Sequence, residues 1–264
     1  MKSEKKIENG LVCVFDILGY KNILLNNSID DCAIMIKDIL AELPQQVIQK
    51  ILGISPNIIV LKETLVFFEE HFRYIMVSDS VIMFFDYEGM SKYKKSIYVM
   101  LSIFLIINFK YMCFKSGFPM RSCIDFGSFY YYENIFAGKT IITCFTESEK
   151  LDFSGIIITE DAGEFVINSI AKKYKKYFGR CLLKYIVPLN NGREEEKYII
   201  DWYTTSHDEH IVNDLRNEIF NTFNMHNKTI DKSVKRKINN TKKIIKYFLY
   251  GDKKYESDTS PNKR

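Results

Sequence analysis

The sequence has little of the residues that break regular structure. Among its 264 residues there are 12 glycines and 5 prolines. Collagen-like and linker-dominated chains need far more of both, so these classes are excluded. Hydrophobic residues make up 47% and charged residues 27% of the chain. That composition indicates a folded globular protein rather than a disordered one.

Closely spaced cysteines are also absent. No two of the six cysteines lie within four residues of each other, which excludes a zinc knuckle and a CxxC redox motif. We therefore expect reduced thiols packed in the core of a cytoplasmic protein. These cysteines are Cys13, Cys32, Cys113, Cys123, Cys144 and Cys181.

No hydrophobic run is long enough for a typical membrane span. The longest run, 97–109, is interrupted by Ser102 and Asn108, whereas a span needs about 20 apolar residues. We expect it to form a buried core helix and expect no membrane partner. The first residues, MKSEKKIENG, lack the apolar stretch of a signal peptide. The net charge of +4 does not by itself indicate a nucleic acid or membrane partner.

Apolar patterning predicts alternating strands and helices. Two strands, 72–77 and 81–85, are separated only by Ser78, Asp79 and Ser80, which predicts a hairpin. A turn is expected at Gly127, followed by an extended stretch over 129–132. The other expected strands are 11–16, 120–126, 155–159, 182–188 and 198–202, and the expected helices are 27–51, 91–114, 138–150, 161–177, 213–223 and 234–249.

This order predicts an α+β fold. A strand and helix, a central hairpin, and a further helix and strand fit a ferredoxin-like (split βαβ) sheet with helices on one face, followed by a C-terminal β-hairpin and helices. We expect a single domain over 1–250, with a core at 11–160 and a C-terminal extension at 161–250. Residues 251–264 are polar and are expected to be disordered.

Two acidic residues stand out by context. Asp16 ends the first buried strand, and Asp79 lies at the tip of the predicted hairpin. In a ferredoxin-like sheet these elements are neighbours, so the two carboxylates would lie close together and would favour a cation between them. Hard oxygen ligands of this kind suit Mg²⁺ or Mn²⁺ with a polyphosphate substrate. The alternative is that Asp16 is a capping residue and Asp79 a turn former.

Several stretches resemble motifs of class III nucleotidyl cyclases. The resemblance follows the same order along the chain, and it is closest to a bacterial branch that includes the pyrimidine cyclases of the Pycsar antiphage systems. The similar stretches are VFDILGY (14–20, the first metal motif), MVSDSVIMFF (76–85, the second metal hairpin), MRSCIDFG (120–127), AGKTIITCFTESEKLDFSGIIIT (137–159), YIIDW (198–202) and VKRKINNTKKII (234–245).

The resemblance implies a reaction and a set of residues. Asp16 and Asp79, helped by the Ile17 carbonyl, would hold two divalent ions, Mg²⁺ or Mn²⁺. A nucleoside triphosphate, UTP or CTP, would be converted to its 3′,5′-cyclic monophosphate and pyrophosphate as a second messenger of antiphage defence, sensed by a separate effector. The active sites would lie at the interface of a homodimer. The implied nucleotide contacts are Arg121, Lys139, Glu149 and Phe153.

The chain also departs from the family pattern. Many class III cyclases carry an asparagine and, four residues later, an arginine on the helix that follows Gly138, where this chain has Ile142 and Thr146. A catalytically degenerate module that binds a nucleotide or a protein partner therefore remains open. So does nucleic-acid binding by the segment 233–264, which has ten Lys/Arg and three Asp/Glu. The apolar positions of the helix 234–249 favour docking on the core instead, so a nucleic acid partner is not expected.

Overall fold

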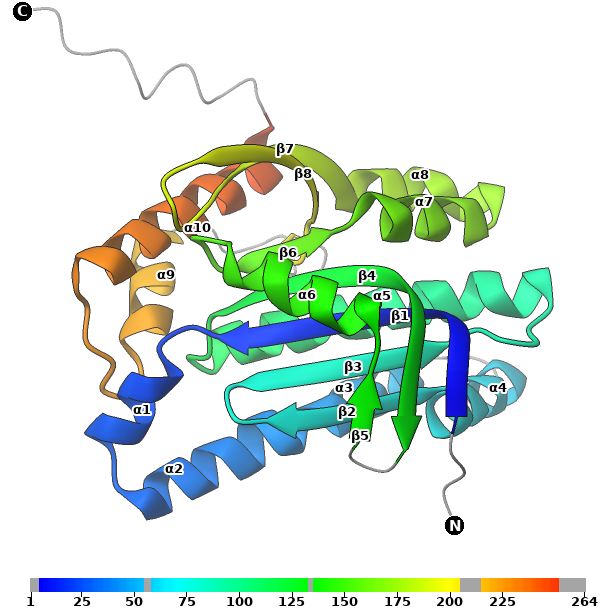
Figure 1. Ribbon diagram of the computed structural model, residues 1–264, viewed down its shortest axis with the longest axis horizontal. Helices are drawn as coiled ribbons and strands as arrows, with labels where there is room; N and C mark the ends of the chain where they lie inside the picture. Colours follow the sequence, from blue (N-terminus) through cyan, green and yellow to red (C-terminus); the bar gives the residue numbers. More distant parts are fainter. Residues whose placement is uncertain (1–4, 55–57, 133–134, 205–214, 252–264) are drawn as a thin grey trace, which may run out of the picture.

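The computed structural model describes residues 5–54, 58–132, 135–204 and 215–251. Within these residues the strands form one eight-stranded sheet in the order β2-β3-β1-β4-β6-β8-β7, with β5 paired to β4 off this path (Figure 1). The strands are β1 (Lys5–Ile17), β2 (Phe72–Val77), β3 (Ser80–Asp86), β4 (Met120–Tyr132), β5 (Ile135–Ala137), β6 (Gly155–Ile158), β7 (Leu182–Pro188) and β8 (Glu194–Ile200).

Helices connect these strands. The helices are α1 (Tyr20–Asn26), α2 (Ile29–Met35), the π-helical segment η1 (Ile36–Ala41), α3 (Leu43–Ile54), α4 (Ile58–Glu70), α5 (Lys92–Lys115), α6 (Lys139–Glu149), α7 (Glu160–Ser169), α8 (Lys172–Cys181), α9 (Leu215–Asn224) and α10 (Lys232–Tyr250).

The first four strands have the ferredoxin-like arrangement. Strand β3 pairs antiparallel with both β1 and β2, so β1 and β2 run in the same direction with β3 between them. Strand β4 pairs antiparallel with β1 on the other side. This is the split βαβ order, and the predicted α+β fold class is confirmed. Strand β6 then extends the sheet in parallel to β4, and the β7–β8 hairpin completes it.

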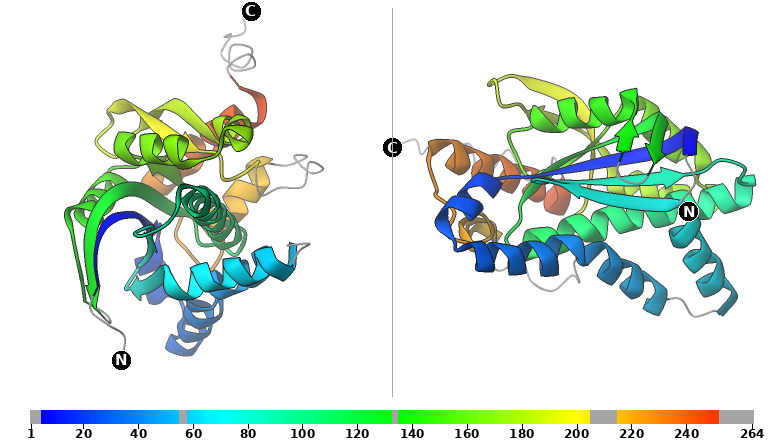
Figure 2. Two further views of the ribbon diagram at one scale, coloured as in Figure 1. Left: turned by 90° about the vertical axis from the view of Figure 1, so that its right-hand side faces the viewer. Right: turned by 60° about the horizontal axis from the view of Figure 1, so that its bottom comes forward.

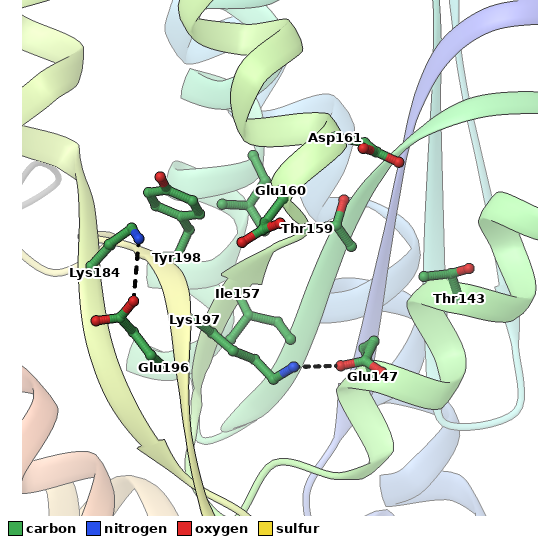
Figure 3. A pocket seen from close by; sticks show the side chains of 11 residues that line it. Thr143, Glu147, Ile157, Thr159, Glu160, Asp161, Lys184, Glu196, Lys197 and Tyr198 are labelled. Carbon is green, nitrogen blue, oxygen red and sulfur yellow. Dashed lines mark hydrogen bonds and ion pairs between the residues drawn. The ribbon is translucent and has the colours of Figure 1, made fainter.

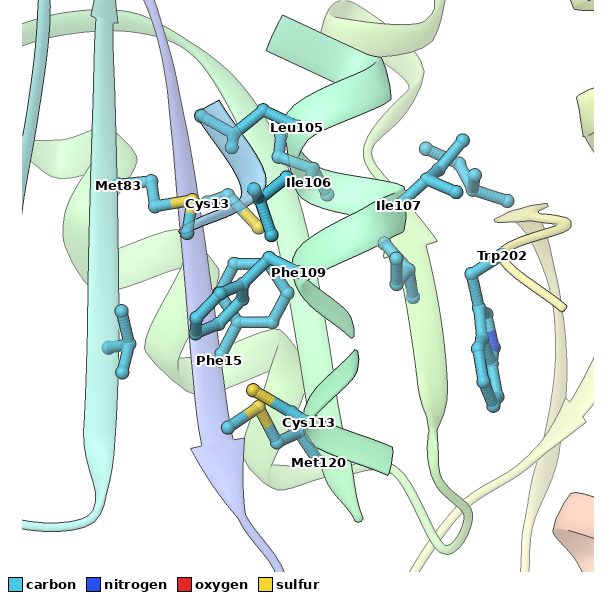
Figure 4. Close-up of a cluster of buried hydrophobic side chains, with 14 of the residues drawn as sticks. Cys13, Phe15, Met83, Leu105, Ile106, Ile107, Phe109, Cys113, Met120 and Trp202 are labelled. Carbon is cyan, nitrogen blue, oxygen red and sulfur yellow. The ribbon is translucent and has the colours of Figure 1, made fainter. Parts of the chain in front are cut away.

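Both faces of the sheet bury a hydrophobic cluster. Alternate β1 residues such as Phe15 face α5, where the Phe15 and Phe109 rings meet edge-on with centroids 4.9 Å apart (Figure 4). The intervening residues Val12 and Val14 face the other way and pack with Cys144 of α6. The prediction of helices on one face is therefore incomplete, because α6 covers part of the opposite face (Figure 2).

Helix α5 is the expected core helix. Ser91 caps its first turn by accepting a hydrogen bond from the Lys94 amide. The helix is long and apolar enough to cross a membrane by composition, but 67% of its most apolar window is buried within the protein. Its packing against the sheet explains the apolar sequence on most of its circumference.

Some predicted boundaries are wrong. Strand β4 continues through Gly127, where a turn was expected. The glycine is instead needed for packing: a Cβ there would lie 2.7 Å from Thr140 Oγ1, so only glycine lets α6 approach so closely. The predicted helix 161–177 is two helices, interrupted at Ile170, which is extended and buried. Helices α1 and α4 were not predicted. The expected disorder over 251–264 falls almost entirely outside the described residues.

Candidate active site

Sheet register brings Asp16 and Asp79 to the same edge. Asp16 lies near the end of β1 opposite Ser80, the first residue of β3. Asp79 belongs to the tight turn between β2 and β3, in which Ser78 adopts a left-handed φ of 55°. The Ile17 amide donates to the Asp79 carbonyl over 2.9 Å, so the turn is tied directly to the segment that follows Asp16. The structure therefore places the two acidic residues at the same edge of the sheet.

Arg121 completes this edge. It lies opposite Asp16 on β4, and its Nε donates to Asp16 Oδ2 over 2.5 Å. A second guanidinium nitrogen donates to the Glu149 carbonyl over 2.6 Å, at the end of α6. Asp16 and Arg121 point toward the α6 face because they share the alternation of Val12, Val14 and Cys123. Arg121 thereby joins the end of β1 to the end of α6.

The pKa of the Asp16 carboxyl is raised from its ordinary value. Burial is the largest cause, since Asp16 is only 8% exposed. The Arg121 charge and hydrogen bond act in the opposite direction, and the negative charges of Asp79 and Glu149 add to the increase. A second cation beside Asp16 and Asp79 would relieve both the burial cost and the repulsion between the carboxylates.

The donor set fits a hard divalent cation. Asp16 and Asp79 offer carboxylate oxygens. Ile17 follows Asp16 in the chain, and its amide is bonded to the Asp79 carbonyl. No group of three or more His, Cys, Asp or Glu is gathered as a metal site among the described residues. Mg²⁺ is commonly held by one or two carboxylates together with substrate phosphates and water, so two carboxylates suffice for this class of site.

The other expected nucleotide contacts are not all gathered here. Glu149 is exposed at the end of α6 nearest Arg121. Lys139 is at the opposite end of this 11-residue helix, about 15 Å away along its axis. Phe153 is fully buried in the second hydrophobic cluster, with its ring against Gly155. Within a single chain, the edge of the sheet therefore brings together Asp16, Asp79, Arg121 and Glu149. The buried position of Phe153 favours a packing role instead.

Sequence reasoning missed Asn190. Its side chain donates to the Glu149 carbonyl over 2.8 Å, the same acceptor that Arg121 uses. Asn190 is in the β7–β8 connection, and its amide also donates to the Lys150 carbonyl over 2.8 Å. The only sequence signal was the polar turn Asn190–Asn191–Gly192 between two strands, which predicts a hairpin but not its contact with α6.

Ile142 and Thr146 lie on the exposed side of α6. Ile142 is 67% exposed, and Thr146 is also exposed one turn later. The helix therefore directs these two residues toward solvent in the single chain. An isoleucine has no hydrogen-bonding group, so position 142 cannot donate to a phosphate or ribose oxygen.

A separate cavity of about 420 Å³ lies beside α6, between β6, the start of α7 and the β7–β8 hairpin (Figure 3). Its charged side chains pair with one another: Lys197 contacts Glu147 over 2.8 Å, and Lys184 contacts Glu196 over 3.2 Å. Glu160 and Asp161 add further negative charge to the wall. This excess of carboxylates disfavours a triphosphate, so the cavity is not the site that Asp16 and Asp79 define.

No protein-family model and no curated protein matches the chain. Among solved structures, it is similar to the guanylyl cyclase domain of the RhoGC fusion protein from the aquatic fungus Blastocladiella emersonii, with 13% identity over 76% of this chain and 98% of that one and a TM-score of 0.49.

Two further solved structures are similar. The guanylate cyclase domain of RhGC from Catenaria anguillulae, in complex with GTP, has 12% identity over 74% of this chain and 97% of that one, with a TM-score of 0.46. A class III adenylyl cyclase-like ATP-binding protein from Pseudomonas aeruginosa has 14% identity over 66% and 37%, with a TM-score of 0.43. At such low similarity, function has to be inferred from the residues of the site.

Proposed function

We propose that this protein is a nucleotidyl cyclase. It converts a nucleoside triphosphate, UTP or CTP, to the 3′,5′-cyclic monophosphate and pyrophosphate. The observation that carries the proposal is the hydrogen-bonded edge that brings together Asp16 and Asp79, two acids expected from motifs 63 residues apart, and at which Arg121 pairs with Asp16. The choice of a pyrimidine base rests on the motif resemblance alone.

The residues of the edge have distinct parts in this reaction. Asp16 and Asp79 would hold two divalent ions, Mg²⁺ or Mn²⁺, against the triphosphate. When bound, such ions neutralise phosphate charge and favour ionisation of the ribose 3′-hydroxyl. Arg121 orients the Asp16 carboxylate, and the Glu149 carbonyl in turn holds Arg121. The 3′-oxygen forms the new bond to the α-phosphorus, the bond to the pyrophosphate breaks, and the hydroxyl proton passes to solvent.

The wider role follows the same proposal. The protein acts in the cytoplasm as a homodimer whose active sites lie at the subunit interface, and its cyclic product is sensed by a separate effector in antiphage defence. A homodimer would also give Lys139 a part, because this residue is exposed and far from Asp16 of its own chain. A partner's α6 could present Lys139 to the triphosphate.

The test is incubation of the purified protein with ATP, GTP, CTP and UTP in Mn²⁺, with the products identified by mass spectrometry. We expect one cyclic monophosphate as the main product, and loss of that product in Asp16→Asn and Asp79→Asn. Asp30→Asn is the matched control because Asp30 is an exposed carboxylate on α2. Full activity in either site variant would refute the proposal.

A second function is favoured by one observation. Ile142 and Thr146 replace the expected Asn and Arg and are exposed on α6, so a polar pair for the transition state is missing from that helix. A non-catalytic module that binds a nucleotide would have this feature. Binding of a nucleotide that requires Asp79, without turnover of any of the four triphosphates, would favour this second function over the first.

A further inference from the structure

The connection between α9 and α10 lies against the segment that follows Asp16. His226 and Asn227 of this connection contact the end of α1: Asn27 Nδ2 donates to the His226 carbonyl over 2.9 Å, and Asn227 Nδ2 donates to Asn27 Oδ1 over 2.9 Å. Asn26 Nδ2 donates to the Asn227 carbonyl over 2.6 Å. Figure 1 shows this connection beside α1, although the two segments are about 200 residues apart in sequence.

His226 and Lys228 also hold the turn between α5 and β4. His226 Nε2 lies 2.7 Å from the Ser116 carbonyl, and its ring packs on Phe118 with centroids 4.7 Å apart. Lys228 is 6% exposed, and its ammonium donates to the carbonyls of Gly117 and, over 3.2 Å, Thr222. A buried ammonium whose partners are carbonyls fixes the positions of those carbonyls.

Two glycines leave room for this connection. A Cβ at Gly117, which has a φ of +83°, would lie 2.7 Å from His226 Nε2. A Cβ at Gly19, with a φ of +82°, would lie 3.1 Å from Lys228 Cδ. The aliphatic stem of Lys228 therefore lies against the first residue after the Asp16–Leu18 segment, while its ammonium is bound beyond it. Gly19 also precedes the first turn of α1.

The connection itself has an unfavourable backbone. His226 and Asn227 are consecutive residues other than glycine with φ of 60° and 56°. Left-handed backbone at such residues persists where surrounding contacts impose it. Here the contacts come from α1 on one side and from the 116–118 turn on the other.

These contacts reach the candidate active site through the main chain. The Leu18 amide donates to the Pro119 carbonyl over 2.8 Å, and the Ile17 amide donates to the Asp79 carbonyl over 2.9 Å. Residues 17–19 are thus held by the Asp79 turn, by the 116–119 turn and by the Lys228 stem. We propose that residues 226–228 form a clamp that positions the Ile17–Gly19 segment, with Lys228 as the positioning residue. The consequence for metal binding rests on the proposed function.

The clamp is tested with Lys228→Met, which keeps an unbranched stem and removes the ammonium. Lys235→Met is the matched control, because Lys235 is an exposed lysine on α10. Amide hydrogen exchange of the metal-free protein, followed by mass spectrometry, should be faster over residues 17–25 in Lys228→Met and unchanged in Lys235→Met. Unchanged exchange in a folded Lys228→Met would overturn the clamp.

A second readout tests the consequence for the metal site. Mn²⁺ affinity, measured by calorimetry without nucleotide, should fall about 10-fold in Lys228→Met, as when an outer support of a metal ligand is removed. Wild-type affinity in a variant with faster exchange would overturn this consequence. If the wild-type protein binds Mn²⁺ but Asp16→Asn binds it equally well, the proposed function fails instead, and the exchange result still decides the clamp.

Should Lys228→Met fail to fold, Asn227→Gly decides the question. Glycine tolerates the left-handed φ of position 227, so the fold is expected to survive while the bond to Asn27 Oδ1 is lost. Exchange over residues 17–25 should again become faster. Wild-type exchange in a folded Asn227→Gly would then overturn the clamp.

Discussion

Lys110 makes the stability of this protein depend on pH in a way that one substitution can reveal. It is fully buried on α5, and its ammonium donates over 2.6 Å to both the Met120 carbonyl and Ser154 Oγ. Burial lowers the pKa of Lys110 from 10.5 to about 7. The Trp202 ring, whose centroid lies 4.7 Å from Nζ, favours the charged form, but burial dominates.

The sign and size follow from proton linkage. As the pH rises from 7 towards 10.5, the pKa of Lys110 in the unfolded chain, the folded chain loses the Lys110 proton while the unfolded chain still holds it. Stability therefore rises with pH in this window. Compared with a side chain that is always neutral, Lys110 lowers the free energy of unfolding by about 4 kcal/mol at pH 7 and by about 2 kcal/mol at pH 9. These values use 1.36 kcal/mol per pKa unit.

Lys110→Met removes that cost together with two hydrogen bonds, each worth about 1 kcal/mol. The acceptors keep a partner, because Ser154 Oγ donates to the Met120 carbonyl over 2.9 Å and accepts from the Met120 amide over 3.2 Å. We therefore expect the variant to be more stable than wild type by about 2 kcal/mol at pH 7, and nearly equal to it at pH 9.

Urea unfolding of both proteins at pH 7, 8 and 9 measures this difference. Groups that the two proteins share titrate alike in both, so their effects cancel in the stability difference. Cys113 is an exception, because its charge interaction with Lys110 is a minor cause of the pKa shift of each residue. Lys235→Met, at an exposed position, should give a curve parallel to wild type. A stability difference between Lys110→Met and wild type that stays constant from pH 7 to 9 would refute the reasoning.

Three other predictions concern the site and its support. Arg121→Met should raise the pKa of Asp16 further, since the opposing charge and hydrogen bond are lost; ¹³C NMR of the carboxyl group would measure the shift, and a fall would contradict the assignment. Phe153→Ala should lower the free energy of unfolding by about 3–5 kcal/mol in urea, whereas a change below about 1 kcal/mol would argue against a core role. Gly127→Val should separate α6 from β4 and lower the thermal midpoint, because its side chain would meet Thr140; an unchanged midpoint would contradict this.

The sequence predicted the elements that carry strong local signals. The strand before Asp16, the Ser78–Asp79–Ser80 turn and the capped helix α5 lie close to their expected places. The meeting of Asp16 and Asp79 could be predicted because it follows from strand order in a split βαβ sheet. The position of Glu149 next to Arg121 depends on the packing of α6 on the sheet, which no local pattern specifies.

Where tertiary contacts override local pattern, the predictions fail. Helix α4, with the sequence IIVLKETLVFFEE, has apolar residues in long runs, so its pattern does not distinguish helix from strand. At the break between α7 and α8, the Ser96 hydroxyl accepts a hydrogen bond from the Ala171 amide over 2.8 Å, a tertiary contact that the local pattern does not predict. Gly127 suggests a turn in sequence, yet it lies within a strand, and the close approach of α6 accounts for the missing side chain.

Two buried lysines hold the turn from α5 to β4, and one of them ties the α9–α10 connection to it. Lys110 binds the Met120 carbonyl from within the core, while Lys228 binds the Gly117 carbonyl from the α9–α10 connection. Between these two carbonyls, Pro119 accepts the Leu18 amide, and directly after them Arg121 pairs with Asp16. The turn from α5 to β4 is therefore held from both sides at the point where it supports the acidic edge. Burying each ammonium has a cost, which its hydrogen bonds to carbonyl groups offset only in part.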